Sequence, residues 1–313
     1  MRLRSDRLAS ALLACLTAIA LAGCQNTTET THDRKPPRVV PHVKGETRAP
    51  VTKVLVVIEE NHSLDEMRGG MPYLASLVGR YGYATRWTAL THPSEPNYLA
   101  IVGGSTFGVK DDAPPSVNAH KVGEAQSIFG LALDAGKTAR TYAESMPENC
   151  HGEDHPEKTV GKPIYAARHN PWVYFTAERE QCLRNDVDLT SFAADVAADD
   201  LPNVGFLIPD LTHDAHDASL SEADAWLEKQ LGPVLRSADF RSGRLAVVVT
   251  ADEDDRKHGN TVLTAVLQVD VRHEVVAAPL THYSLTRFLA EVVGATPPRE
   301  ARDAADLRAA FGL

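Results

Sequence analysis

Residues 54–63 read Val-Leu-Val-Val-Ile-Glu-Glu-Asn-His-Ser, a continuous apolar run followed at once by acidic, amide and imidazole side chains. A short unbroken run of aliphatic residues is typical of a strand buried on both faces, as in a parallel sheet. In open α/β sheets, binding sites lie beyond the carboxyl ends of such strands. This stretch therefore predicts a buried parallel strand with a polar site at its end.

Three more apolar runs of strand length follow, at Val204–Ile208, Leu245–Val249 and Thr264–Val269. Segments with a helical pattern lie between the strand runs, at Tyr73–Tyr81, Ser127–Ala135, Leu189–Ala198, Ser221–Leu235 and Tyr283–Val293. Strands that alternate with helices favour βαβ units. We predict an α/β fold whose mostly parallel central sheet carries helices on both faces, in one domain over residues 51–313.

The overall charge argues against one class of partner. The 313 residues include 32 Lys and Arg against 42 Asp and Glu, which gives a net charge of −10. General affinity for nucleic acids depends on clustered basic side chains that neutralise phosphates. We therefore expect no nucleic-acid partner.

The N-terminus has the pattern of an export signal. A basic start leads into a short apolar run that ends in Leu-Ala-Gly-Cys at residues 21–24, which resembles the lipobox of bacterial lipoproteins. We expect residues 1–23 to be a lipoprotein signal peptide and Cys24 to carry the lipid. That lipid would anchor an exported protein on the extracytoplasmic side of a bacterial cell membrane. An ordinary secretory cleavage site is the alternative.

The next segment and the remaining cysteines fit an exported chain. Residues 24–50 are rich in Thr, Pro and charged residues, and we predict that they form a flexible tether. Cys150 and Cys182 are the only cysteines beyond Cys24. Two thiols in an oxidising compartment are expected to form a disulfide, with a catalytic cysteine as the alternative.

Polar clusters follow two further strand runs as they follow the first. Residues 209–217 read Pro-Asp-Leu-Thr-His-Asp-Ala-His-Asp, and residues 250–255 read Thr-Ala-Asp-Glu-Asp-Asp. Any one cluster could be a solvated acidic loop, but three clusters after three strands point to one site. Carboxylates gathered in that site would repel one another without a cation, so we expect a divalent metal, with Ca²⁺, Mg²⁺, Mn²⁺ and Zn²⁺ as candidates.

We predict two groups of polar residues from these clusters. The first is dominated by oxygen ligands and would hold the metal: Glu60, Asn61, Asp252 and Glu253. The second carries more nitrogen: Asp214, His216, Asp217 and His282.

Residues 91–98, Thr-His-Pro-Ser-Glu-Pro-Asn-Tyr, supply a candidate nucleophile. Pro96 suits the first turn of a helix, which places Ser94 at the helix N-terminus, where N–H groups and the helix dipole stabilise anions. A nearby metal would lower the pKa of the Ser94 hydroxyl. The alternative is that Ser94 only caps the helix.

Five motifs follow one another along the chain, at Glu60–Ser63, His92–Tyr98, Arg168–Trp172, Asp214–Asp217 and Asp252–Asp254. Together, and in this order, they resemble the motifs of a bacterial phosphoesterase family that includes acid phosphatases and phosphatidylcholine-type phospholipases C. The resemblance implies an alkaline phosphatase-like fold with a divalent metal. Two positions depart from the family pattern, because Ala251 stands where Trp is usual and His213 where Asn is usual.

The resemblance also implies roles for individual residues. Ser94 would be the nucleophile, His92 would act in catalysis, and Asn97, His169 and Asn170 would face the substrate phosphate. We expect an exported, metal-dependent phosphoric monoester hydrolase that forms a phosphoenzyme on Ser94. Its substrate would be a small phosphate ester or a phospholipid head group. The alternatives are a phospholipase C-like phosphodiesterase on lipid head groups and a non-catalytic surface-binding lipoprotein.

Overall fold

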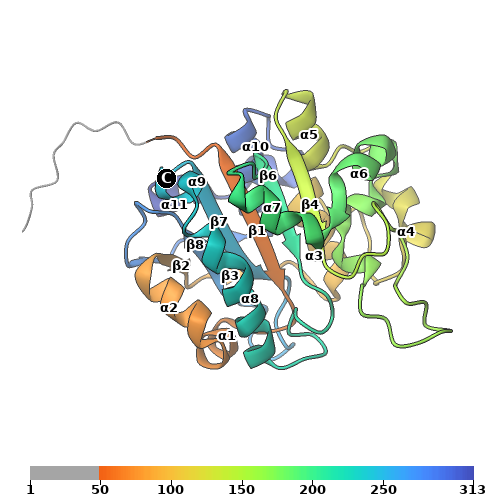
Figure 1. Ribbon diagram of the computed structural model, residues 1–313, viewed down its shortest axis with the longest axis horizontal. Helices are drawn as coiled ribbons and strands as arrows, with labels where there is room; N and C mark the ends of the chain where they lie inside the picture. The colour runs from red at the N-terminus through yellow and green to blue at the C-terminus, as the bar shows by residue number, and fades with distance from the viewer. Residues whose placement is uncertain (1–48) are drawn as a thin grey trace, which may run out of the picture. The chain divides into compact units, whose positions relative to one another are not determined.

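A computed structural model describes residues 49–313, in which eight strands form one sheet in the order β5-β4-β6-β1-β7-β8-β2-β9 (Figure 1). The central strand β1 lies between β6 and β7 and is parallel to both. These strands are β1 (Lys53–Glu59), β2 (Gly82–Ala84), β4 (Ala139–Ala143), β5 (Asp186–Asp188), β6 (Val204–Ile208), β7 (Leu245–Ala251), β8 (Thr264–Leu267) and β9 (Glu274–Val276). A separate pair is formed by β3 (Trp87–Thr88) and β10 (Leu280–Thr281).

The sheet is mostly parallel, as predicted, with one exception. Strand β8 runs antiparallel to both of its neighbours, β7 and β2, so the expectation of a parallel strand at 264–269 was wrong. The reason lies in the connection, since residues 252–263 contain no helix that could carry the chain back across the sheet. The chain reverses direction after β7 instead.

All five predicted helices are present, with ends that differ by at most three residues. Helices α2, α7 and α8 lie in front of the sheet in Figure 1, and α3 and α10 lie behind it. The α-helices are α1 (Leu64–Gly70), α2 (Pro72–Arg80), α3 (Ser94–Gly103), α4 (Pro115–Val122), α5 (Ile128–Asp134), α6 (Arg179–Asn185), α7 (Phe192–Ala197), α8 (Leu220–Val234), α9 (Ala238–Arg241), α10 (His282–Val293) and α11 (Leu307–Phe311). The 3₁₀ helices are η1 (Ala167–His169), η2 (Pro171–Tyr174), η3 (Thr176–Glu178), η4 (Leu189–Ser191) and η5 (Arg299–Asp303).

The core holds the ends of the central strands in place. Every residue of β7, and every residue of β1 after Lys53, is buried. Truncating one large aliphatic side chain in such a core costs about 2 to 5 kcal/mol. The loops that leave β1 and β7 therefore start from rigid positions.

Several predictions concern residues outside this description. The signal peptide, the lipid acceptor Cys24 and nearly all of the tether lie outside the described residues. Within residues 49–313, no helix combines the length and the apolar character that crossing a membrane requires. The described elements all belong to a single compact unit.

Candidate active site

The three polar clusters meet at the carboxyl ends of the central strands. The Glu60 amide donates to the Asp214 carbonyl (2.7 Å), and the Asp252 amide donates to the Glu59 carbonyl (3.0 Å). The Asn61 amide donates to Oδ1 of Asp252 at 3.1 Å. Asn61 adopts a φ of 53°, a left-handed conformation that Asn tolerates better than most residues. The geometry thus brings segments about 190 residues apart in the sequence into direct contact.

Ser94 lies inside this group of residues. It is the first residue of α3, and its hydroxyl donates to Oε2 of Glu60 at 3.1 Å. The cap position itself is Pro93, and no side chain caps the helix there. The hydroxyl of Ser94 is therefore directed to the buried acid rather than to the helix backbone.

The start of α3 offers fewer free N–H groups than the sequence suggested. Pro96 has no N–H, and the Glu95 amide already donates to Oδ1 of Asp112 at 2.9 Å. An anion beside Ser94 can therefore draw little on the amides of this helix.

Tyr98 is a site residue that the sequence reasoning missed. It lies one turn after Ser94 on the same helix, and its hydroxyl donates a short hydrogen bond to Oε1 of Glu60. Its ring stacks on that of His169, with centroids 5.3 Å apart. The i, i+4 spacing from Ser94 was the signal that could have identified it, because such residues share a helix face.

His169 joins two buried acids. Its Nε2 lies 3.4 Å from Oε1 of Glu60, and its Nδ1 lies 3.2 Å from Oδ2 of Asp214. The ring is almost completely buried. The structure therefore places His169 among the carboxylates beside Ser94.

The acids of the site have strongly raised pKa values. Burial, with the nearby charge of Asp252, raises the pKa of Glu60 well above its usual range. Burial also raises the pKa of Asp214 and of Asp252, each to about 7. Several carboxylates packed together without water are stable as anions only when a cation offsets their charge.

The acceptors of the site suit a divalent cation. Oδ1 of Asn61, Oδ2 of Asp252 and Oδ2 of Asp214 are buried and accept no hydrogen bond from any described residue. Unpaired carboxylate and amide oxygens are the ligands that hard divalent cations prefer. Two of the four predicted ligands, Asn61 and Asp252, thus present unpaired oxygens that could hold one. The oxygens of Glu60 lie in the same group but accept hydrogen bonds from Ser94 and Tyr98.

The fourth predicted ligand, Glu253, is engaged elsewhere. Its Oε1 lies 2.9 Å from Nδ1 of His92, and its Oε2 accepts from the amide of Asn97 at 3.3 Å. The other His92 nitrogen lies 3.2 Å from Oδ1 of Asp254. His92 is therefore held between two carboxylates, and no hydrogen bond joins it to Ser94 in the described residues.

Asn97 also differs from its expected role. Its Oδ1 accepts from the amides of Leu90 and Thr91, at 3.0 and 3.2 Å, and its Nδ2 donates to the Thr91 carbonyl at 2.8 Å. It is fully buried. Because both ends of the amide are used, Asn97 holds the loop before Ser94 in shape and has no group left for a substrate phosphate.

His282 does not join the second cluster that was predicted for it. Its Nε2–H donates to the Asp252 carbonyl at 2.7 Å, and its Nδ1 accepts from the Trp87 indole at 3.3 Å. Burial lowers the pKa of His282 to about 4, so the ring is neutral. His282 therefore holds the backbone of Asp252 in place through this hydrogen bond. The pairing of β3 with β10, which the sequence did not predict, positions the start of α10 for this contact.

The remaining members of the predicted second cluster, Asp214, His216 and Asp217, differ in how deeply they are buried. Asp214 is buried in the site, while His216 and Asp217 lie nearer the surface. Nδ1 of His216 is 3.0 Å from Oδ1 of Asp217, whose other oxygen is 3.2 Å from Nζ of Lys162. Asp217 is therefore a partner of His216 and Lys162 near the surface rather than a buried metal ligand.

Three other groups of side chains bring possible ligand atoms within 4.8 Å of one another in the described residues. The Cys150–Cys182–Asp186 group contains a disulfide, and the Glu66–Asp255–His258 group is partly exposed to solvent. The third group, Glu144, Asp210 and His213, is hydrogen-bonded by neighbouring side chains. None of the three has the unpaired acceptors that mark the site around Glu60.

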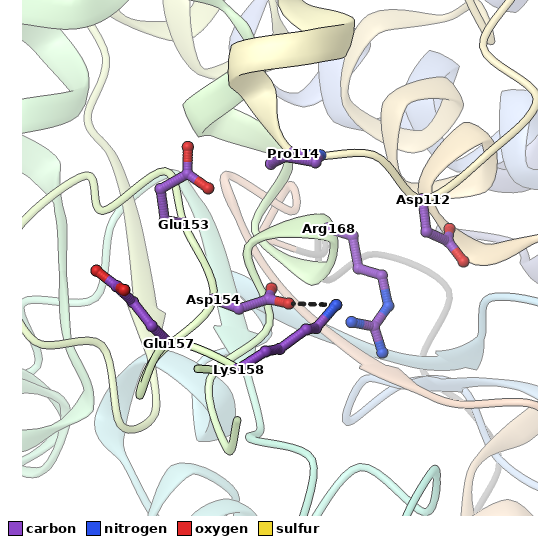
Figure 2. A pocket seen from close by; sticks show the side chains of 7 residues that line it. All are labelled: Asp112, Pro114, Glu153, Asp154, Glu157, Lys158 and Arg168. Carbon is purple, nitrogen blue, oxygen red and sulfur yellow. Dashed lines mark ion pairs between the residues drawn. The ribbon is translucent and has the colours of Figure 1, made fainter. Parts of the chain in front are cut away.

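An open cleft adjoins the buried site. It consists of two neighbouring cavities of about 360 and 350 Å³ that share Asp112, Asp154, Lys158 and Arg168. Figure 2 shows the lining of the first. His216 lines the second cavity. Arg168 directly precedes His169 in η1, so the cleft and the buried carboxylates are joined through adjacent residues. The volume suits a small ester.

Asn170, which was expected to face the substrate, is directed away from this cleft. Its Nδ2 donates to Oδ2 of Asp186 at 2.8 Å and to the Tyr165 hydroxyl at 3.1 Å. Asn170 follows His169 directly in the sequence, but η1 ends at His169. The His169 side chain therefore contacts Glu60, while the Asn170 side chain contacts Asp186. Its role is to tie η1 to β5.

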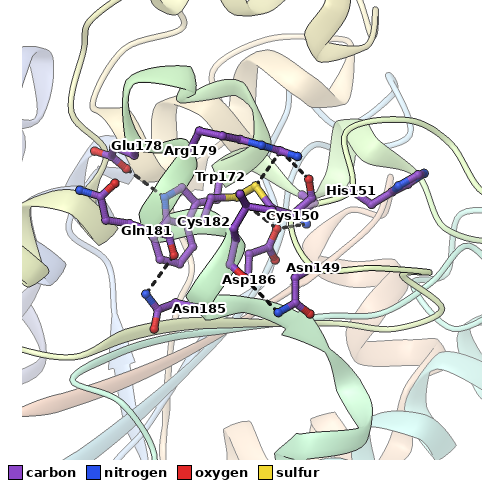
Figure 3. Close-up of a disulfide and its surroundings, with 12 residues drawn as sticks. Asn149, Cys150, His151, Trp172, Glu178, Arg179, Gln181, Cys182, Asn185 and Asp186 are labelled. Carbon is purple, nitrogen blue, oxygen red and sulfur yellow. Dashed lines mark hydrogen bonds between the residues drawn. A yellow bond between two sulfur atoms is a disulfide. The ribbon is translucent and has the colours of Figure 1, made fainter.

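The predicted disulfide between Cys150 and Cys182 is confirmed (Figure 3). The two Cα atoms are 5.4 Å apart, and the bond closes a loop across 32 residues. A loop of this length stabilises the fold by about 3 to 4 kcal/mol in the chain-entropy model. Because both sulfurs are used, neither cysteine is a catalytic nucleophile.

Comparisons of structure define the class of fold. A protein of the alkaline phosphatase superfamily from Vibrio parahaemolyticus matches with a TM-score of 0.55 and 12% identity, over 81% of this chain and 70% of that one. A phosphonate monoester hydrolase from Silicibacter pomeroyi matches with a TM-score of 0.52 and 11% identity, over 83% and 76%. The fold is that of the alkaline phosphatase superfamily, as the motifs implied.

Comparisons of sequence define the family. The Phosphoesterase family matches residues 70–287, and the chain belongs to it. The phosphatidylinositol-3-phosphatase of Mycobacterium tuberculosis is 32% identical over 248 residues, which cover 77% of this chain and 76% of that protein. The acid phosphatase of Aspergillus fumigatus is 30% identical over 210 residues, 64% of this chain and 46% of that protein, so the chain spans about half of the fungal enzyme. The protein is a hydrolase of phosphate esters.

Proposed function

We propose that this protein is a metal-dependent phosphoric monoester hydrolase that uses Ser94 as its nucleophile. The observation that carries the proposal is the Ser94–Glu60 hydrogen bond inside a group of buried, unpaired acceptors. The relatives named phosphatases support hydrolysis of a monoester. The intact nucleophile and acceptors argue against a binding protein without activity.

The first step transfers the phosphoryl group to the protein. Ser94 Oγ attacks phosphorus and the bond to the leaving oxygen breaks, while the hydroxyl proton moves along the existing hydrogen bond to Oε2 of Glu60. A water then attacks the phosphoserine, which releases inorganic phosphate and returns the proton to Oγ. A divalent cation held by Glu60, Asn61 and Asp252 would supply positive charge for the attacking oxygen and the phosphoryl oxygens.

The leaving oxygen needs a proton, and His216 is the candidate donor. Asp217 holds its Nδ1, which leaves Nε2 for the cleft that His216 lines. Such a carboxylate–imidazole pair fixes the tautomer and supports the charged ring. The same nitrogen can then remove a proton from the attacking water.

Replacing His216 with Gln is expected to affect substrates unequally. Turnover of glycerol 2-phosphate should fall about 100-fold, because its alkoxide leaves poorly without a proton, and that of p-nitrophenyl phosphate should fall less than about tenfold. A matched control is His213→Gln, since that ring stacks on Trp226 and contacts Glu144 instead. Equal losses on the two substrates would argue against a role in protonation.

The choice between monoester and diester substrates can be tested directly. We expect p-nitrophenyl phosphate to be hydrolysed at least about tenfold faster than bis-p-nitrophenyl phosphate at equal concentration. Faster cleavage of the diester would instead favour a phospholipase C-like activity. We propose a small phosphate ester or a phosphorylated head group as the natural substrate, because one relative is named for a phosphoinositide.

Export and lipid anchoring also stand as proposals. The sequence at residues 21–24 supports an acylated Cys24 on the extracytoplasmic side of a bacterial membrane. The Cys150–Cys182 disulfide adds support, because such bonds persist mainly in oxidising compartments.

A further inference from the structure

We propose that Arg168 binds the non-bridging oxygens of the substrate phosphoryl group, a role that rests on the function proposed above. Arg168 is half-buried and lines both cavities of the cleft. Its side chain points into the cleft in Figure 2. Among the described residues, its guanidinium makes no hydrogen bond and no ion pair. A half-buried cation without a partner marks a place for an anionic ligand.

The cleft that Arg168 lines adjoins the buried site through consecutive residues. His169 follows Arg168 in η1, and its ring nitrogens lie 3.4 Å from Oε1 of Glu60 and 3.2 Å from Oδ2 of Asp214. The other oxygen of Glu60 accepts the hydrogen bond from Ser94. Arg168 is therefore one residue away from a side chain that contacts the acid beside the proposed nucleophile.

The shape of the guanidinium suits this ligand. It presents five N–H donors in a plane, and two of them can donate side by side to two phosphoryl oxygens. A lysine offers a point charge without that geometry. The reacting group is a dianion that gains charge in the transition state, so an aligned donor pair would favour the transition state over the bound substrate.

The other cations of the cleft are already paired and exposed. Nζ of Lys158 lies 3.2 Å from Asp154, and its side chain is 75% exposed. Nζ of Lys162 lies 3.2 Å from Asp217, with 74% exposed. Exposed pairs of this kind contribute little net energy. Because His169 and Asn170 contact protein groups instead, Arg168 is the one described side chain of its motif left to hold the phosphate.

The test compares Arg168→Ala and Arg168→Lys with the unchanged enzyme. We expect kcat/KM for p-nitrophenyl phosphate to fall about 100- to 1,000-fold in the Ala variant, with a smaller loss in the Lys variant. The inhibition constant of inorganic phosphate should rise at least about tenfold in the Ala variant, and added guanidinium ion should restore part of the activity. A matched control is Arg244→Ala, because Arg244 pairs with Asp239 beside the start of β7 and away from the site.

The possible outcomes separate this proposal from the one it rests on. A folded Arg168→Ala protein that keeps its phosphate inhibition constant and its kcat/KM would overturn the role of Arg168 while leaving the hydrolase intact. An unchanged enzyme that hydrolyses no phosphate monoester would instead contradict the proposed function. Should the Ala variant not fold, the Arg168→Lys variant, which keeps the charge and the bulk, decides through the phosphate inhibition constant.

Discussion

Replacing Ser94 with Ala should lower kcat for p-nitrophenyl phosphate by roughly 10⁴- to 10⁶-fold, because removing a nucleophile abolishes the covalent step. The side chain loses one oxygen in a site where Ser94 is only 3% exposed, so the fold should persist. Rapid acid quenching of the unchanged enzyme with labelled substrate should trap phosphate on Ser94. The Ala variant should trap none.

Two results would speak against Ser94 as the nucleophile. One is a folded Ser94→Ala protein that retains more than about a tenth of wild-type turnover. The other is label recovered on a different residue. Ser105→Ala is a suitable control, because the Ser105 hydroxyl contacts the exposed Glu300 and takes no part in the site. That variant should retain full activity.

Removing the metal should have the second large effect. We expect a chelator to reduce turnover by at least about 1,000-fold, and Asp252→Asn to do the same with metal present. The reason is that chelation removes, and loss of the Asp252 carboxylate weakens the binding of, the cation that would stabilise the developing negative charge. Asp255→Asn is the matched control. Asp255 belongs to the same acidic segment but pairs with Lys257 and His258 outside the site. Activity that is insensitive both to chelation and to Asp252→Asn would contradict metal dependence.

Although Asp252→Asn should lower activity, it should raise the stability of the metal-free protein. The pKa of Asp252 is raised by burial to about 7, above its value in the unfolded chain. A raised pKa means that the folded protein loses stability as the pH rises from about 4 towards 7, since folding must then bury the charge. In chelator at pH 8, Asp252→Asn should therefore increase the free energy of unfolding by roughly 1 to 4 kcal/mol. Urea unfolding at pH 5 and pH 8 measures the difference.

The residues that directly follow the parallel strands were the part of the site that the sequence could predict. Parallel strands finish at one edge of a sheet, so the apolar runs before Glu60 and Asp252 were enough to predict that these residues meet. Ser94 was placed by a different signal, since Pro96 suits the first turn of a helix and so indicated that Ser94 lies at the helix start.

Side-chain direction and long-range support could not be predicted. Asn170 follows His169 directly, yet it turns to Asp186 because η1 ends between the two side chains. His282 is far in sequence from Asp252, and the pairing of β3 with β10 brings the start of α10 into contact with the Asp252 backbone. Such contacts depend on tertiary packing, which leaves no local pattern in the sequence. Arg168 was part of a quoted motif, but its lack of a partner is visible only in three dimensions.

The outermost strands of the sheet have a consequence for how the protein behaves in concentrated solution. Both β5 and β9 are three residues long, and β5 reads Asp-Val-Asp. An unpaired strand edge invites pairing with another chain, and short, charged edges oppose it. Asp186 is buried, so the charge at the β5 edge comes from the part-exposed Asp188. The ends of this broad sheet therefore resist edge-to-edge aggregation mainly because both strands are short, and less at β9, where the Val275 side chain is exposed.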